Sequence, residues 1–290
     1  MKVELSNKKE KENAVKVEII IPTLNEEKAI GDLIHSIRSH HFPIEVSILV
    51  IDGGSTDHTV EICKKENVNV IRQKRKGKGN AMKEAVEYSN ADIIVFIDGD
   101  GTYFIDDLES MLEPLLTDKA DMVVGSRVSG KREKGAISTL NMLGNKLFNK
   151  TINFALHSQV TDSLSGYRAM RKEVFEDLVL FSINFEIEVE ITVEFLAKGY
   201  RIAEVPIKYG VRKGTVTKLN PINDGIKIGR TLLFILMNVT PIKFFGIFCL
   251  AFVIIGLYPA GYVIREKIMT GEIVSMPSVV FASLLFVTGA

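Results

Sequence analysis

The chain has 290 residues, of which 46% are hydrophobic and 25% charged, so it can bury the core of one large domain or of two small ones. Its 36 basic and 36 acidic residues cancel, and this balance argues against the strongly basic surface of a nucleic-acid-binding domain. Two cysteines, Cys63 and Cys249, indicate neither a disulfide framework nor a zinc site, which fits a reducing, cytoplasmic setting for the soluble part.

Residues 1–16 are polar and charged, and they contain no apolar stretch of the kind that a signal peptide needs. We expect them to form a flexible tail. The domain expected after this tail spans residues 17–221, and in its first half short apolar runs alternate with stretches of helix length. The apolar runs are 17–21, 46–51, 68–71, 93–97 and 122–124, and the helical stretches are 26–39, 59–66, 79–88 and 106–116.

This alternation predicts an α/β fold with a parallel sheet that helices cover on both faces, because continuous β-branched runs are typical of strands buried on two sides. The second half of the domain is expected to add helices at 139–155 and 185–197 and a strand at 202–209.

The composition changes at residue 222. A helix drawn over 222–236 at about 100° per residue places Asn223, Asp224, Lys227 and Arg230 on one arc and mostly apolar residues on the rest. The segment 222–240 is therefore expected to be an amphipathic helix. It either lies in the interface of a bilayer or packs on the domain as an ordinary amphipathic helix, and both interpretations stay open.

Two uncharged stretches follow, at 244–264 and 273–290. At about 1.5 Å per residue the first covers the roughly 30 Å hydrocarbon layer, and a kink at Pro259 is tolerated in a membrane helix. Residues 241–290 are predicted to form two transmembrane helices, with the sequence expected to end inside the second. Lys227, Arg230 and Lys243 precede the first span, and this charge bias favours a multi-pass protein of the cell membrane whose catalytic domain is cytoplasmic.

Polar loops follow three of the predicted strands, at 22–26 (PTLNE), 52–57 (DGGSTD) and 98–101 (DGDG). Ligands of α/β sheets gather at the carboxyl ends of the strands, so we expect these loops to form one site. Asp98 and Asp100 can approach a hard cation such as Mg²⁺ or Mn²⁺, which readily shares oxygen ligands with a diphosphate. Such a metal would stabilise charge on a departing nucleoside diphosphate. The alternative is a solvated acidic turn.

Two neighbouring segments extend this predicted site. Asp52 is placed to accept hydrogen bonds from a base or a ribose, Gly53 permits the tight turn, and Asp57 is expected to cap the next helix. Lys78 stands at the end of the basic run 72–78, just before a predicted helix. It either faces the diphosphate, because helix N-termini favour anions, or belongs to a solvated basic loop.

Taken in order, the three polar loops resemble glycosyltransferase family 2, whose domain has the GT-A (Rossmann-like) fold. Later motifs resemble the polyprenyl-phosphate sugar synthases of that family, which include dolichol-phosphate mannose synthases and archaeal dolichyl/polyprenyl-phosphate hexosyltransferases. These motifs are GSR at 125–127, DSLSGYR at 162–168, FEIE at 185–188 and EVPI at 204–207. The resemblance covers about residues 17–221 and implies a GT-A domain, and the C-terminal transmembrane helical hairpin predicted above agrees with it.

The resemblance also assigns roles to individual residues. It implies contacts with the nucleotide in the first two loops, at Pro22, Leu24, Asn25, Glu26, Asp52 and Gly53. It implies that Asp98 and Asp100 serve the metal and the diphosphate. It implies that Arg127 holds a lipid phosphate and that Arg212 and Lys218 reach phosphates of the donor or the acceptor. The chain departs from the mannose synthases at Thr102, where they usually carry Gln, so the sugar and its nucleotide stay open.

The acceptor decides what catalysis requires. A hydroxyl acceptor needs a base, whereas a phosphate monoester is largely dianionic at neutral pH and attacks without one. Asp162 is either that base or a positioning residue. Arg127 and Arg168 suit phosphate binding because a guanidinium makes bidentate contacts, and the alternative for Arg168 is an ion pair with Asp162. In-line attack by a phosphate would invert the anomeric centre, as the resemblance implies.

These patterns together predict an inverting glycosyltransferase with Asp100, Arg127, Asp162 and Arg168 as its catalytic residues. It would move a hexose from a UDP- or GDP-linked sugar to a dolichyl or polyprenyl phosphate at the membrane surface, with lipid as a partner and no nucleic acid. One alternative is a family 2 enzyme acting on a hydroxyl of a glycolipid or polysaccharide, although the chain has no Trp for the QxxRW motif of processive synthases. Another is a non-catalytic membrane protein that binds a nucleotide sugar.

Overall fold

The computed structural model describes residues 15–212, 214 and 221–289. The predicted tail therefore lies outside the described residues except for its last two positions, and so does Lys218. The chain divides into two compact units, and the boundary between them in the sequence falls between Leu232 and Leu233. The domain limits predicted from the sequence stay predictions.

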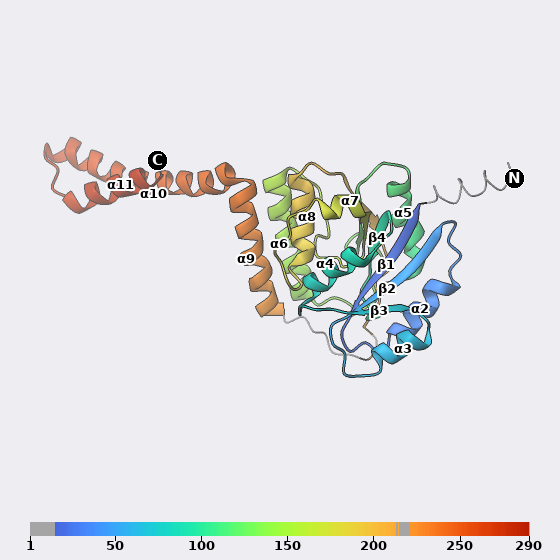
Figure 1. Ribbon diagram of the computed structural model, residues 1–290. Helices are drawn as coiled ribbons and strands as arrows, with labels where there is room; N and C mark the ends of the chain where they lie inside the picture. The colour runs from blue at the N-terminus through green and yellow to red at the C-terminus, as the bar shows by residue number, and fades with distance from the viewer. Residues whose placement is uncertain (1–14, 213, 215–220, 290) are drawn as a thin grey trace. The chain divides into compact units, whose positions relative to one another are not determined.

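Within the described residues, strands of the first unit form one seven-stranded sheet in the order β3-β2-β1-β4-β6-β5-β7 (Figure 1). Their bounds are Lys16–Thr23 (β1), Glu45–Asp52 (β2), Asn69–Arg72 (β3), Ile93–Phe96 (β4), Met122–Ser126 (β5), Arg168–Arg171 (β6) and Ile202–Pro206 (β7). The pairs β1–β2, β1–β4, β2–β3 and β5–β7 are parallel, and their register places Thr23 beside Asp52 at the carboxyl ends of β1 and β2.

The predicted parallel sheet contains one further strand that the sequence did not indicate. β6 is antiparallel to both β4 and β5, which makes the sheet mixed. The sequence does not indicate this strand because its four residues, Arg-Ala-Met-Arg, do not form an apolar run. It is nevertheless a central strand, and Arg168 at its start is fully buried.

Helices cover both faces of the sheet, as predicted. The first unit contains α2 (Ile30–Ser39), α3 (Thr59–Lys65), α4 (Lys78–Tyr88), η1 (Ile105–Asp107), α5 (Leu108–Leu116), α6 (Thr139–Leu156), α7 (Lys172–Glu176) and α8 (Ile187–Ala197). Side chains of α2 and α5 pack with Ile19 and Ile21 on one face, and those of α4 and α8 pack with Ile20 on the other. Successive residues of a strand point to opposite faces, so β1 takes part in both cores.

The first predicted helix begins later than expected, at Ile30 rather than residue 26. The Glu26 carbonyl accepts hydrogen bonds from the backbone N–H groups of Ala29 and Ile30, and Asn25 has a left-handed φ of 53°. Residues 25–29 therefore form a turn, which leaves the Asn25 and Glu26 side chains at the carboxyl edge of the sheet.

Three helices make up the C-terminal part: α9 (Pro221–Val239), α10 (Pro241–Thr270) and α11 (Met276–Gly289). The amphipathic helix expected at 222–240 is present as α9, and Ile228 and Leu232 are buried on it. Among the described residues, α10 alone is long and apolar enough to cross a membrane. Its 30 residues extend about 45 Å, beyond the roughly 30 Å hydrocarbon layer.

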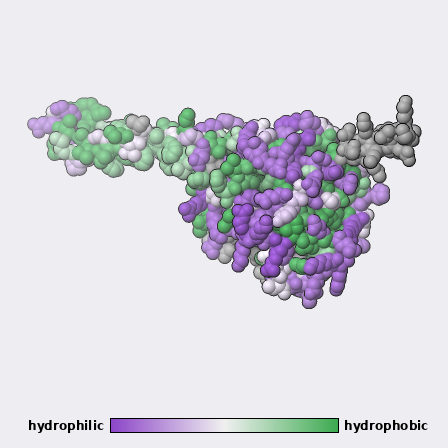
Figure 2. Space-filling view, viewed as in Figure 1, coloured by the Kyte–Doolittle hydropathy of each residue, from purple (hydrophilic) through white to green (hydrophobic). Residues whose placement is uncertain are grey.

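The predicted second transmembrane span is not confirmed. α11 has 14 residues and extends about 21 Å, which is shorter than the hydrocarbon layer. It runs back along α10, because a Cβ on Gly256 would lie 3.2 Å from Leu285 and one on Gly289 would lie 3.0 Å from Val253. Both helices are mostly hydrophobic on the face seen in Figure 2.

Gly79 in α4 lies close to the backbone of a neighbouring segment. A Cβ on Gly79 would lie 2.6 Å from the Ser182 carbonyl oxygen, whereas one on Gly144 in α6 would meet nothing nearer than Phe148 at 4.0 Å. We expect Gly79→Ala to destabilise the protein by about 1–3 kcal/mol through overpacking. Gly144→Ala should stabilise it by about 0.5–1 kcal/mol through helix propensity. Thermal unfolding in detergent compares the two, and equal midpoints would contradict the packing described.

Candidate active site

The acidic triplet lies directly after β4, at the carboxyl edge of the sheet. Asp98 exposes 28% of its side chain and Asp100 exposes 11%. Glycine at residue 99 avoids a close contact, since a Cβ there would lie 2.9 Å from Cγ2 of Thr23. One oxygen of Asp100, Oδ1, accepts hydrogen bonds from the backbone N–H (3.1 Å) and the hydroxyl (2.7 Å) of Thr102. Thr102, the departure noted in the sequence, therefore orients Asp100.

Lys78, whose side chain is 14% exposed, faces the first carboxylate of the triplet. Lys78 Nζ lies 2.5 Å from Asp98 Oδ1 and 2.7 Å from Glu188 Oε1. Burial alone would lower the pKa of Lys78, but these two carboxylates outweigh it and raise that pKa, so the ammonium stays charged. Gly166 makes room for the pair, because a Cβ there would lie 2.7 Å from Asp98 Oδ2 and 3.1 Å from Lys78 Nζ.

An arginine faces the second carboxylate. Arg212 donates from Nε to Asp100 Oδ2 at 2.9 Å, and its Nη2 lies 2.9 Å from the same oxygen. Nη2 also lies 3.2 Å from Oε1 of Glu26, a residue that is 4% exposed. The structure thus brings together Glu26, Asp98 and Asp100, which the sequence placed in one site, and supplies each with a cation.

The first two predicted loops are tied to one another beside this cluster. Asp52 is buried, and its carboxylate accepts hydrogen bonds from the backbone N–H groups of Gly54 and Ser55 at 2.9–3.1 Å. Asn25 links the loops, since its Oδ1 accepts from the Thr56 N–H at 2.8 Å and its own N–H donates to the Ser55 hydroxyl. Both side chains hold the loop conformation, and their predicted contacts with a nucleotide stay predictions.

The remaining loop residues lie at the same edge. Leu24 is 41% exposed and Pro22 is half-buried. Gly53 lies close to β1, because its N–H donates to the Thr23 carbonyl at 2.8 Å and a Cβ would lie 3.2 Å from that oxygen. The N-cap residue of α3 is His58 rather than the predicted Asp57, although Asp57 Oδ1 accepts from the N–H of Thr59, the first residue of that helix, at 3.0 Å.

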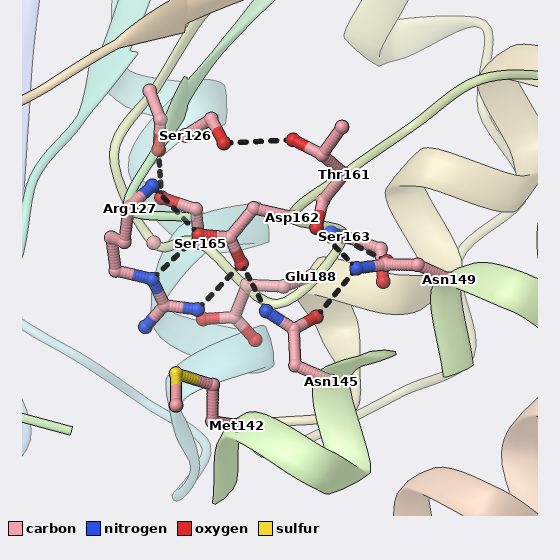
Figure 3. A network of polar contacts seen from close by, with 12 residues as sticks. Ser126, Arg127, Met142, Asn145, Asn149, Thr161, Asp162, Ser163, Ser165 and Glu188 are labelled. Atoms are coloured by element: carbon pink, nitrogen blue, oxygen red, sulfur yellow. Dashed lines mark hydrogen bonds and ion pairs between the residues drawn. The ribbon is translucent and has the colours of Figure 1, made fainter. Parts of the chain in front are cut away.

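A second polar cluster surrounds Asp162, as Figure 3 shows. Its carboxylate accepts hydrogen bonds from the backbone N–H, Nε and Nη2 of Arg127 at 2.8–2.9 Å and from Nδ2 of Asn145 at 2.7 Å. Asn149 donates to Oδ1 of Asn145, and Glu204 accepts from the backbone N–H of Asp162 at 3.0 Å. Helix α6 and strand β7 therefore fix the position of this carboxylate.

Asp162 is poorly suited to be the base that the sequence allowed. It is 0% exposed. Burial alone would raise its pKa, but the Arg127 guanidinium and the hydrogen bonds outweigh burial and hold that pKa below the usual range of carboxyls. A low pKa disfavours proton uptake at neutral pH, so the geometry supports the positioning role, in which Asp162 holds Arg127.

Arg168 does not occupy the place that the sequence suggested. It is fully buried and donates to the Ser163 and Ser165 carbonyls and, at 2.9 Å, to the Thr192 hydroxyl. Burial lowers the pKa of its guanidinium to about 10. Asp162 pairs with Arg127 instead, so the Arg168–Asp162 ion pair is not observed in the described part of the chain, and the phosphate contact of Arg168 stays a prediction. Arg168 braces the loop 163–165 against α8.

The residues of the triplet fit a metal that brings its own ligands. Among the described residues, no group of three or more His, Cys, Asp or Glu side chains is arranged to hold a metal ion. Asp98 and Asp100 supply carboxylate oxygens, the ligands that Mg²⁺ prefers, and that ion commonly completes its shell with water and substrate phosphates. The donor set therefore fits a metal bound to a diphosphate better than a cage made by the protein alone.

Glu188 and Asn145 belong to the site although the sequence does not indicate either of them as a site residue. Glu188 stands in the FEIE motif, but an acid at the start of a helix is too common to single out. Its Oε2 is buried and has no hydrogen-bond partner in the described part of the chain. Asn145 lies within a helix, where nothing in the local pattern marks it as a partner of Asp162.

The chain is similar to known glycosyltransferases in both sequence and fold. The family model described as glycosyl transferase family 2 matches residues 18–179. Glycosyltransferase AglJ of Haloferax volcanii is 38% identical, covering 93% of this chain and 90% of that protein. Dolichyl-phosphate hexose transferase of the same organism is 34% identical, covering 74% and 91%. A crystal structure of Mycobacterium tuberculosis glucosyl-3-phosphoglycerate synthase with Mn²⁺, UDP and phosphoglyceric acid has a TM-score of 0.62 at 23% identity, covers 79% of each chain, and shows a shared fold.

The pair Arg127–Asp162 generates a stability prediction. Asp162→Asn neutralises one partner of a buried ion pair, so we expect the free energy of unfolding to fall by about 3–5 kcal/mol at neutral pH. Because the folded pKa of Asp162 is lowered, its contribution is complete above the unfolded carboxyl pKa of about 4 and is lost as pH falls through the folded value. The gap in melting midpoint between wild type and variant should therefore narrow in acid.

Asp177→Asn is the matched control, because Asp177 forms an exposed ion pair with Lys198 at 2.8 Å. Exposed pairs contribute little, so its melting midpoint should stay close to that of wild type. Equal losses in both variants would contradict the role of Asp162.

Proposed function

Because this chain belongs to glycosyl transferase family 2, and is a glycosyltransferase, we propose that it transfers a hexose from a nucleotide diphosphate sugar to a dolichyl or polyprenyl phosphate. The observation that carries the proposal is the pairing of two sites: a cation-rich acidic edge suited to a metal-bound diphosphate, and a fixed arginine suited to a second phosphate. The transfer inverts the anomeric carbon, so an α-linked donor gives a β-linked product.

The acidic edge would hold the donor. Asp98 and Asp100 would hold the metal, which would neutralise charge on the departing nucleoside diphosphate. Arg212 and Lys78 lie within reach of the same carboxylates, so they can stabilise the diphosphate oxygens as well. Leu24, Asn25 and Asp52 stand on the two loops beside them, where a nucleoside would lie. The donor is UDP- or GDP-linked.

The arginine site would hold the acceptor. The Asp162 carboxylate accepts hydrogen bonds from Nε and Nη2 of Arg127. The Cζ atom of Arg127 also lies 5.4 Å from the centroid of the Tyr209 ring. Within the described residues Nη1 of Arg127 donates no hydrogen bond, so we assign Nη1 to the acceptor phosphate. The acceptor phosphate is its own nucleophile and needs no base, which agrees with an Asp162 committed to Arg127.

Helix α6 connects this arginine site with a surface suited to lipid. Its inner side carries Asn145 to Asp162. Its outer side carries four exposed apolar residues at spacings of three, four and seven, which form one stripe: Leu140, Leu143, Leu147 and Phe154. A prenyl phosphate joins a charged head to an apolar tail, so a protein that binds it in a bilayer requires an apolar surface beside a phosphate site.

We also propose that the protein is anchored in the cell membrane. α10 supplies one span by length and composition. The multi-pass arrangement, with α11 as a second span and the catalytic domain cytoplasmic, rests on the uncharged stretch 273–290 and on Lys227, Arg230 and Lys243 before the first span.

Product analysis tests the proposed reaction. Membranes containing the protein are incubated with Mn²⁺ or Mg²⁺, labelled UDP- and GDP-hexoses, and either a polyprenyl phosphate or the matching polyprenol. We expect mass spectrometry to find a hexosylated lipid phosphate with one donor and no product from the alcohol. Product formed on hydroxyl acceptors alone would favour the glycolipid alternative, and donor binding without product on any acceptor would favour a non-catalytic role.

The triplet itself has a matched pair of variants. Asp100→Ala removes a metal ligand, so we expect transfer to fall by at least about 10²-fold while the melting midpoint shows a folded protein. Asp106→Ala removes a nearby acid whose side chain is 64% exposed, and its transfer rate should match wild type. Full activity in the folded Asp100→Ala protein would contradict the metal role.

A further inference from the structure

We propose that Arg212 is a placeholder cation that occupies the metal position when no donor is bound and is exchanged for the metal when the metal-bound diphosphate enters. This inference rests on the proposed donor site. Its basis is that one guanidinium bridges Asp100 and Glu26, two carboxylates that the donor site needs.

The hydrogen bonds of Asp100 show why the two cations exclude one another. Its Oδ1 already accepts from the N–H and the hydroxyl of Thr102, and its Oδ2 accepts from Arg212 at 2.9 Å. A metal bound to Oδ2 would stand where the positively charged guanidinium now lies. Like charges at contact distance repel, so Arg212 must leave when the metal binds.

Lys78 is in a different situation. It contacts Asp98 through Oδ1, which leaves Oδ2 as a separate oxygen beside Gly166. Lys78 is also held by Glu188, whose side chain is 5% exposed, so its departure would remove the cation that contacts a second, buried carboxylate. A metal can therefore use Asp98 Oδ2 while Lys78 stays, and Arg212 is the cation that is exchanged.

The backbone around Arg212 allows the exchange without a large movement. Gly210 donates to the Thr102 carbonyl at 2.8 Å, and the Val211 N–H donates to Glu133 Oε2 at 2.8 Å. The chain is thus anchored up to the residue before Arg212, and the long side chain can turn about its own bonds. Once released from Asp100, the guanidinium remains within reach of phosphate oxygens on the bound diphosphate, which suit its forked geometry.

The exchange has a thermodynamic consequence. A free metal ion must displace Arg212 without offering it a new partner, whereas a metal-bound diphosphate supplies phosphate oxygens for the released guanidinium. Metal and nucleotide should therefore bind with positive cooperativity, and by linkage each should raise the affinity for the other by the same factor. Arg212 is predicted to be the source of much of this coupling.

The test measures Mn²⁺ affinity by electron paramagnetic resonance on the full chain in detergent, with and without UDP or GDP. Without nucleotide we expect Arg212→Met to bind Mn²⁺ more tightly than wild type, within the range of about 5- to 150-fold that is typical of coupled sites. With nucleotide, wild type should gain more affinity than Arg212→Met gains. Lys208→Met is the control, since Lys208 is 54% exposed and lies 3.7 Å from Asp106, and it should match wild type throughout.

A second variant keeps the test decisive if Arg212→Met does not fold. Arg212→Lys keeps the charge but has no planar fork to bridge Asp100 and Glu26, so its Mn²⁺ affinity without nucleotide should lie above that of wild type. Equal affinities for free Mn²⁺ in wild type and the Arg212 variants, with equal gains from nucleotide, would overturn the inference. Failure of the proposed function looks different: no variant would bind Mn²⁺ with nucleotide, and wild type would transfer no sugar.

Discussion

The structure depends on one electrostatic constraint at the carboxyl edge of the sheet. Parallel strands β1, β2 and β4 end together there, so Glu26, Asp52, Asp98 and Asp100 gather in a small, largely buried space. Burying carboxylates without counter-charges costs several kcal/mol each, and the fold meets this cost with cations and oriented backbone N–H groups. Lys78 and Arg212 come from α4 and from the segment after β7, which draws distant parts of the chain to one edge.

The same constraint shapes the second cluster. Asp162 is buried completely, and it is tolerable there because Arg127 and Asn145 satisfy both of its oxygens. The arrangement also gives Arg127 a fixed orientation, which a phosphate site needs because a guanidinium recognises phosphate through geometry as well as charge. The two clusters differ in the role proposed for them: at the acidic edge Arg212 is exchanged for the metal when the donor binds while Lys78 stays, whereas the Arg127–Asp162 pair stays intact.

Much of this could be predicted from the sequence, and the limits are physical. Apolar runs indicated the strands that precede the three polar loops. The position of Asp98 and Asp100 directly after one of these strands predicted that they lie at the carboxyl edge of the sheet. β6 could not be predicted from the sequence, because a short strand that begins and ends with Arg shows no apolar periodicity. Arg168 was misassigned because sequence shows charge but not burial. Ion pairs such as Lys78–Glu188 join residues far apart in the chain, so no local pattern reveals them.

The central claim is that the acidic edge binds a metal-bound diphosphate and is not merely a cluster of internal ion pairs. Anomalous diffraction from crystals grown with Mn²⁺ and the nucleoside diphosphate tests it most directly. The account predicts a manganese peak about 2.1 Å from carboxylate oxygens of Asp98 and Asp100, with Arg212 turned onto the diphosphate. Nucleotide bound with no manganese at the triplet, and with Arg212 still on Asp100 and Glu26, would contradict it.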